Sequence, residues 1–118
     1  MRTAMDDLKA KTKRFALSAV RASQMLPRNR EADVLGRQFL RSATSIAANY
    51  RSACRARSTS EFIAKLGVAE EEADETLLWL ELLMEAKALS EDKGHELCDE
   101  CEQILRMVVA SIKTSRRK

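Results

Sequence analysis

The sequence predicts an all-α fold, an antiparallel up-down-up-down four-helix bundle. Of the 118 residues, one is proline and three are glycine, so there are few places where a long helix must break. Apolar residues recur at helical spacing along most of the chain. Residues that start or stop helices divide it into four segments, and the short connections between these segments require neighbouring helices to run antiparallel.

A proline separates the first two predicted helices. The first spans 5–26 and carries an apolar stripe. It ends before Pro27, because proline cannot continue a helix and disfavours helical angles at Leu26. The second predicted helix spans 30–57.

Capping residues mark the start of the other two predicted helices. The third spans 59–89, because Ser58 and Glu61 form a capping-box pattern in which each side chain satisfies the other residue's free amide. The fourth begins at 91, where acidic residues suit the positive end of a helix, and it ends near 115.

Length and composition indicate one globular domain, 1–118. A chain of this length can remove about two-thirds of its unfolded surface from water. Apolar residues make up 45% and charged residues 33%, which is typical of folded proteins. No stretch resembles a membrane span or a signal peptide, and three cysteines without secretory features favour a reducing compartment. We therefore expect a cytoplasmic protein without a membrane partner.

Charge is distributed unevenly along the chain. Residues 1–30 hold eight bases and two acids, and residues 31–57 hold five and two. Residues 58–89 reverse this balance with two bases and eight acids, and a basic tail occupies 113–118. The basic first half can pair with the acidic segment within one molecule or between subunits, or it can bind phosphate.

The second predicted helix has an edge of arginines. Five of them fall within about 80° of one another on a helical wheel: Arg30, Arg37, Arg41, Arg51 and Arg55. One interpretation is a solvated face that the acids of the third helix partly neutralise. The other is a phosphate-binding surface, because guanidinium groups match phosphate oxygens. Aromatic residues do not alternate with the arginines, so contact with the backbone of RNA or DNA is expected instead of base stacking.

The third predicted helix is apolar on nearly all sides from Leu77 onward, which a free four-helix bundle does not require. We interpret this segment as a surface for self-association, with Leu78, Trp79 and Leu82 as its candidate residues. The alternative is a wide apolar stripe that contacts two neighbouring helices of the same bundle.

The sequence does not predict an enzyme, a cofactor or a small-molecule substrate. His95, Cys98 and Cys101 resemble one half of a metal site, with Cys54 as a further thiol, but a structural zinc site normally pairs two such groups. Buried free cysteines are expected instead, and no metal. A single histidine gives no nucleophile–base arrangement, and no glycine loop suits a phosphate.

Three stretches carry a resemblance to a known family: 38–50 (QFLRSATSIAANY), 57–66 (RSTSEFIAKL) and 71–83 (EEADETLLWLELL). They resemble the bacterial four-helix bundle proteins encoded in intervening sequences of 23S ribosomal RNA genes, the S23 type. The accessory variability determinant of diversity-generating retroelements is a relative. The resemblance covers nearly the whole chain.

The resemblance implies a cytoplasmic ring-shaped homo-oligomer, typically a pentamer, without known catalysis. It also implies nucleic-acid binding, which is shown for the retroelement relative. Arg41, Asn49 and Arg51 match recurring polar positions of the family's second helix. Ser52 and Ala53 stand where the family often has Glu-Gly or Glu-Ala, so a site that uses this glutamate is altered here.

We therefore predict a non-enzymatic homo-oligomer, a pentameric ring, that binds RNA or DNA through the basic surface of its first two helices. The alternative is a structural or protein-interaction scaffold whose arginines form salt bridges between subunits. The candidate nucleic-acid-binding residues are Arg30, Arg37, Arg41, Asn49, Arg51, Arg55 and Arg57.

Overall fold

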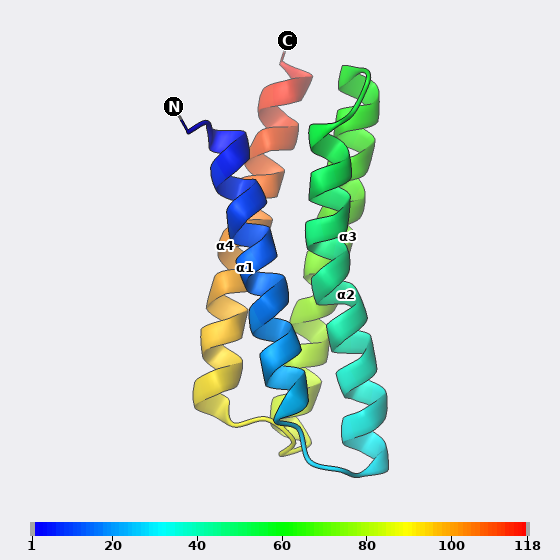
Figure 1. The fold of residues 1–118 in the computed structure, drawn as a ribbon, viewed down its shortest axis with the longest axis vertical. Coiled ribbons are helices and arrows are strands. Elements are labelled where there is room, and N and C mark those ends of the chain that lie inside the picture. Colours follow the sequence, from blue (N-terminus) through cyan, green and yellow to red (C-terminus); the bar gives the residue numbers. More distant parts are fainter. Residues whose placement is uncertain (1, 118) are drawn as a thin grey trace.

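The computed structural model describes residues 2–117, which form four helices joined by short turns (Figure 1). The helices are α1 (Ala4–Gln24), α2 (Arg30–Cys54), α3 (Thr59–Glu85) and α4 (Glu91–Arg116). Successive helices run in opposite directions, so the two ends of the chain lie at the same end of the molecule. The predicted all-α, up-down-up-down bundle is confirmed. Lys118, the last residue of the predicted basic tail, lies outside the described residues, as does Met1.

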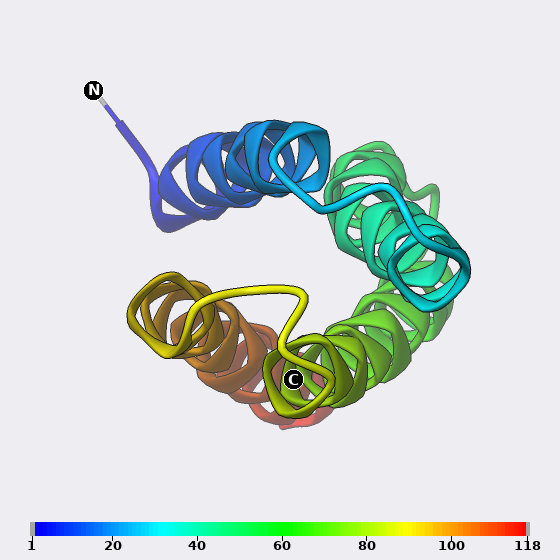
Figure 2. The ribbon, with the colours of Figure 1, turned by 90° about the horizontal axis from the view of Figure 1, so that it is seen from below.

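Each helix packs against the next one in the chain. The bundle is closed by α1 and α4, which pack against each other less extensively than the other neighbouring pairs. In the view from below, the ribbons form an incomplete ring that opens between α1 and α4 (Figure 2). The α1–α4 seam is therefore the least closed part of the bundle.

All four helices contribute to one apolar core, as their helical spacing of apolar residues predicts. Small residues such as Ala43, Ala69 and Ala73 are fully buried where helices approach closely. The largest apolar side chains with almost no exposed surface are Phe15, Phe39, Ile46, Leu66, Leu80, Leu83, Leu97, Ile104 and Val108. Within the described residues, no helix is both long and apolar enough to cross a bilayer.

Each helix begins with a side-chain cap, which satisfies one of the free amides of its first turn. The capping residues are Thr3, Asn29, Ser58 and Ser90, and their oxygens accept backbone hydrogen bonds of 2.9–3.2 Å. The third cap differs in one detail from the prediction. The Glu61 carboxylate accepts a hydrogen bond from the N–H of Arg57 (2.9 Å), where the sequence pattern predicted the N–H of Ser58.

The first two helices end earlier than predicted. α1 ends at Gln24, because the chain tightens into a turn before Pro27. α2 ends at Cys54 and not at 57, since the N–H of Arg57 is already held by the cap of α3. The end of α1 thus follows from Pro27, and the end of α2 coincides with the cap of the next helix.

α3 ends at Glu85 and not at 89 as predicted. Lys87 has a φ of 63°, which is the left-handed conformation. The N–H groups of the next two residues bond to the carbonyl of Leu83 (2.9 and 3.1 Å), which closes the last turn. Glycine usually occupies such a position, so a lysine there gives no sequence signal that the helix ends.

Candidate nucleic-acid interface

Two arginines of the predicted edge are held by carboxylates. Arg41 reaches across to α3, where its Nη1 and Nη2 each lie 3.1 Å from a carboxylate oxygen, of Glu72 and of Glu75 respectively. Arg37 Nε lies 3.2 Å from the carboxylate of Asp33, one turn earlier on α2. An exposed pair such as Arg37–Asp33 contributes about 0–1 kcal/mol to stability. The main consequence of these contacts is that both guanidinium groups are partly neutralised.

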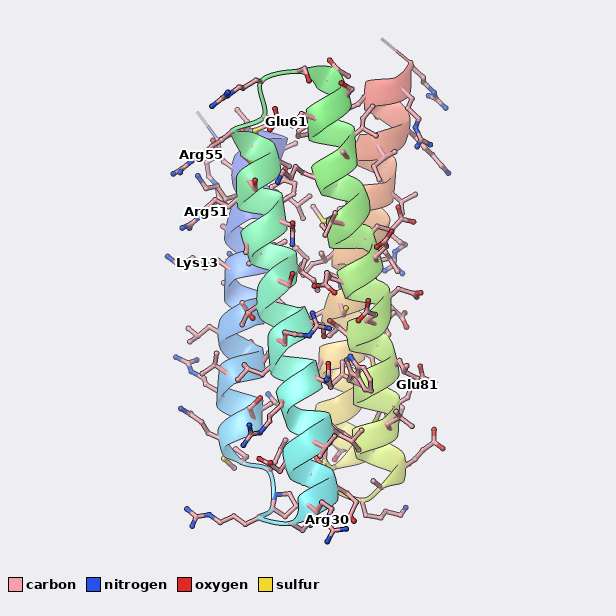
Figure 3. The ribbon with its side chains drawn as sticks, turned by 90° about the vertical axis from the view of Figure 1, so that its right-hand side faces the viewer. Lys13, Arg30, Arg51, Arg55, Glu61 and Glu81 are labelled. Atoms are coloured by element: carbon pink, nitrogen blue, oxygen red, sulfur yellow. The ribbon has the colours of Figure 1, made fainter. Side chains whose placement is uncertain are left out.

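Two other arginines near the end of α2 have no carboxylate partner among residues 2–117. These are Arg51 and Arg55, and both are exposed. Figure 3 shows that they project to the same side of the bundle as Lys13 of α1. The structure therefore brings bases from two helices onto one face.

Lys9 extends this face by one turn of α1. Burial raises the pKa of the Cys54 thiol at the end of α2, and the positive charge of nearby Lys9 opposes that shift. Lys9 therefore lies within electrostatic range of the last turn of α2, on the same side of α1 as Lys13 one turn later. Four residues define what we call the basic patch: Lys9, Lys13, Arg51 and Arg55.

The surroundings of the basic patch reduce its charge only in part. Asp6 lies beside it, since its negative charge adds to the raised pKa of Cys54. The Asp6 carboxylate also accepts a hydrogen bond from the N–H of Thr3 (3.3 Å) in the cap of α1. The arginines interact favourably with the negative end of the α2 dipole. Asp6 therefore offsets only part of the charge of the four bases.

Of the remaining predicted residues, Arg30 and Asn49 do not join the basic patch. Arg30 lies at the other end of α2, about 37 Å from Arg55 at 1.5 Å per residue (Figure 3). Arg57 is exposed in the α2–α3 turn. Asn49 is half-buried, and its amide donates to the carbonyl and the hydroxyl of Ser45, both at 2.9 Å. The seven predicted residues are thus spread along α2 and the turn that follows it, and they do not form one site.

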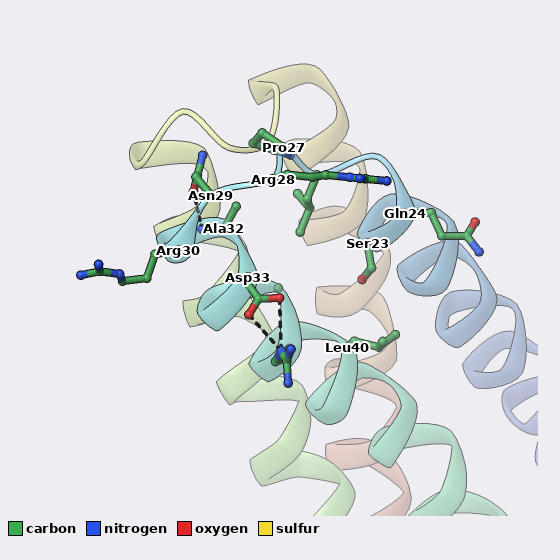
Figure 4. A pocket seen from close by; sticks show the side chains of 12 residues that line it. Ser23, Gln24, Pro27, Arg28, Asn29, Arg30, Ala32, Asp33 and Leu40 are labelled. Atoms are coloured by element: carbon green, nitrogen blue, oxygen red, sulfur yellow. Dashed lines mark hydrogen bonds and ion pairs between the residues drawn. The ribbon is translucent and has the colours of Figure 1, made fainter.

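A cavity of about 620 Å³ lies beside the α1–α2 turn and is lined in part by Arg28, Arg30 and Arg37. In Figure 4, Arg28 and Arg30 extend in opposite directions. Arg37 is paired with Asp33. The three positive charges therefore do not converge on one anion in this cavity.

The three residues predicted for self-association differ in exposure. Leu78 on α3 is 48% exposed, as the prediction requires. Trp79 and Leu82 are half-buried, and Trp79 packs against the core. The indole Nε1 of Trp79 is also enclosed and has no hydrogen-bond partner among the described residues. Trp79 is thus held in part by the core of its own bundle, and its role in self-association stays a prediction.

The cysteines are free thiols. Cys101 is buried, and its thiol donates to the carbonyl of Ala73 on α3 (3.4 Å). Burial raises the pKa of Cys101 to about 12 and also raises the pKa of Cys98. His95 is exposed at the start of α4. In the part of the chain that the structure describes, no three His, Cys, Asp or Glu side chains are grouped as metal ligands.

Comparisons with known proteins agree with this fold. Residues 7–110 match the family of the 23S rRNA-intervening sequence protein. A crystal structure from Bacteroides thetaiotaomicron, of a protein with unknown function from the S23 ribosomal protein family, is 35% identical with a TM-score of 0.85. That similarity covers 90% of this chain and 98% of the other. No curated protein matches. The chain belongs to the 23S rRNA-intervening sequence protein family.

Proposed function

We propose that this protein is a non-enzymatic homo-oligomer that binds the phosphate backbone of RNA or DNA through the basic patch. One observation carries the proposal. Arg51 of α2 and Arg55, which directly follows that helix, project to the same side as Lys13 on α1, and no described carboxylate pairs with them. Guanidinium and ammonium groups on one face can contact successive phosphates.

The patch favours backbone contact over base recognition. Tyr50, which precedes Arg51, is only 2% exposed, so it offers no surface for a base to stack on. The patch also lies on the outside of two packed helices, where it can follow the surface of a duplex. Binding of this kind depends strongly on salt and weakly on sequence.

The oligomer is the second part of the proposal. Leu78 and Val68 are 48% and 41% exposed on the outer side of α3, which supports a second burial partner for this helix. A second copy of the chain is that partner in our proposal, in the pentameric ring that the family resemblance implies. The cytoplasm is the proposed compartment, in keeping with three free thiols.

Titration of labelled structured RNA and duplex DNA at low and physiological salt tests the proposal. The informative variant is Arg51→Ala/Arg55→Ala. Its matched control is Arg37→Ala/Arg41→Ala, which removes the same charge from the same helix but from residues already held by carboxylates. The first variant should lose affinity at least about tenfold, and its log–log salt slope should fall by up to about 1.8, at about 0.9 per phosphate contact.

Light scattering on each variant must show an unchanged mass, so that lost binding is not lost assembly. Equal losses from both variants would mean that affinity follows net charge and not the basic patch. Wild-type protein that binds neither nucleic acid at low salt would contradict the proposal and support the scaffold. In that scaffold Arg41 would not be one of the arginines that join subunits, because Glu72 and Glu75 of the same chain already bind it.

A further inference from the structure

Two cavities lie along the α1–α4 seam, where the bundle is least closed. The larger, of about 670 Å³, lies between the end of α1 and the start of α4. The smaller, of about 240 Å³, lies near the middle of both helices. The ring of ribbons opens along the same seam (Figure 2).

Apolar side chains form part of the wall of both cavities. The larger cavity includes Ala22, Leu89 and Met25, and Met25 is 81% exposed at its rim. The smaller cavity reaches Phe15 and Ile104 of the core. An exposed methionine beside an apolar hollow is suited to binding, because its flexible side chain adapts to the surface placed against it.

Bases outnumber acids around these cavities. Glu100 is the acid among the lining residues, and the four bases are Lys11, Arg14, Arg21 and Lys93. Lys93 is 3.4 Å from the carboxylate of Glu96. The other three bases have no carboxylate partner within residues 2–117. The seam therefore combines apolar hollows with a positive rim, which complements an occupant that is both apolar and acidic.

The spacing of the cavities indicates what kind of occupant fits. On α1, the lining residues of the smaller cavity centre near 14–15 and those of the larger near 23. The cavities are therefore about 13 Å apart along the helix, at 1.5 Å per residue. Two side chains at positions i and i+7 or i+8 of another helix are about 11–12 Å apart on one face. A helix can fill both hollows at once.

We propose that the α1–α4 seam docks an acidic amphipathic helix of a partner protein. Its apolar side chains enter the two cavities, and its carboxylates face Lys11, Arg14 and Arg21. This surface is separate from the basic patch, because no residue of that patch lines either cavity. The protein would then hold nucleic acid on the α1–α2 face and a protein partner at the α1–α4 seam.

A designed peptide tests this inference. The probe is a labelled 18-residue helical peptide with leucines at two-turn spacing and glutamates beside them. Fluorescence anisotropy should show that Met25→Glu weakens its binding at least about tenfold. The matched control is Leu17→Glu, which adds the same charge to α1 at a residue that is 48% exposed and lines neither cavity. It should change binding less than about twofold.

Charge and assembly supply two further outcomes. Arg21→Glu should weaken the binding of the peptide that carries glutamates. A peptide with lysines in place of the glutamates should bind at least about tenfold more weakly to wild-type protein. Equal effects of Met25→Glu and Leu17→Glu, or no peptide binding, would overturn the inference. The inference would also be overturned if Met25→Glu changed the oligomeric mass and the peptide did not bind. A second copy of the chain would then be the molecule that covers the seam. Duplex binding by Met25→Glu should stay unchanged, and this separates the inference from the proposed function.

Discussion

The hydroxyl oxygens of Ser42 on α2 and Thr76 on α3 lie 2.8 Å apart in a hydrogen bond that is fully buried between the two helices. Each residue also contacts a carbonyl of its own helix, Ser42 that of Phe39 (3.2 Å) and Thr76 that of Glu72 (2.7 Å). The pair lies next to the ion pairs of Arg41 with the same stretch of α3. Polar contacts therefore fix the register of α2 against α3 inside an otherwise apolar contact.

We expect Thr76→Val to lower the free energy of unfolding by about 1–2 kcal/mol, because it keeps the shape and leaves the Ser42 hydroxyl with one contact fewer. Ser42→Ala should cost a similar amount. The double variant should cost clearly less than the sum, since neither hydroxyl is then left without its partner. Urea denaturation of wild type, both single variants and the double variant, all at the same protein concentration, measures this double-mutant cycle. Strictly additive losses would show that the two hydroxyls do not interact.

Lys87→Gly should stabilise the protein by about 0.5–1 kcal/mol. Lys87 has a φ of 63°, and this conformation costs a residue with a Cβ about 1–2 kcal/mol. Glycine avoids that cost, but its more flexible unfolded chain offsets part of the gain. Lys87→Ala is the control, because it removes the charge and keeps the Cβ. Thermal unfolding should rank glycine above both alanine and wild type. An equal gain from alanine would assign the effect to charge and not to the backbone.

Sequence patterns predict where these helices begin better than where they end. A helix start carries an identifiable cap, such as Asn29 or Ser58, and the structure uses both. The end of α3 depends on Lys87 in a left-handed conformation and on amides that turn back to Leu83. No residue type marks that turn, so the apolar pattern that continues to Leu89 predicts a longer helix.

The basic surface is predictable only in outline, for a similar reason. The wheel places Arg41 and Arg51 on one edge of the second helix, but it does not say which neighbouring helix each one faces. Arg41 faces α3, where Glu72 and Glu75 bind it. Arg51 faces the side where Lys13 projects. Whether an arginine is free or paired thus depends on tertiary packing.

Gly94→Ala and Gly67→Ala should have opposite effects, although both replace a helical glycine. A Cβ on Gly94 would collide with the side chain of Met84 at the end of α3, and such overpacking costs about 1–3 kcal/mol. A Cβ on Gly67 meets nothing within 4 Å. Gly67→Ala should therefore gain about 1 kcal/mol from helix propensity, while Gly94→Ala should show a net loss. Chemical denaturation compares them directly. Gains from both would mean that Met84 moves aside at little cost.

Cys101 should resist thiol reagents in the folded protein and create a pH dependence in the alkaline range. Burial raises its pKa from 9.0 to about 12, so almost no thiolate forms at pH 8, and labelling with a disulfide reagent should require unfolding.

Because the folded pKa of Cys101 is raised, the stability that the protonated thiol contributes is complete below pH 9 and is lost as the pH rises towards 12. The slope from this group approaches about 1.4 kcal/mol per pH unit. Cys101→Ala will be less stable at pH 8 because it leaves a cavity, but its stability should fall less steeply between pH 9 and 11 than that of wild type. Parallel slopes in the two proteins would show that Cys101 does not titrate differently on folding.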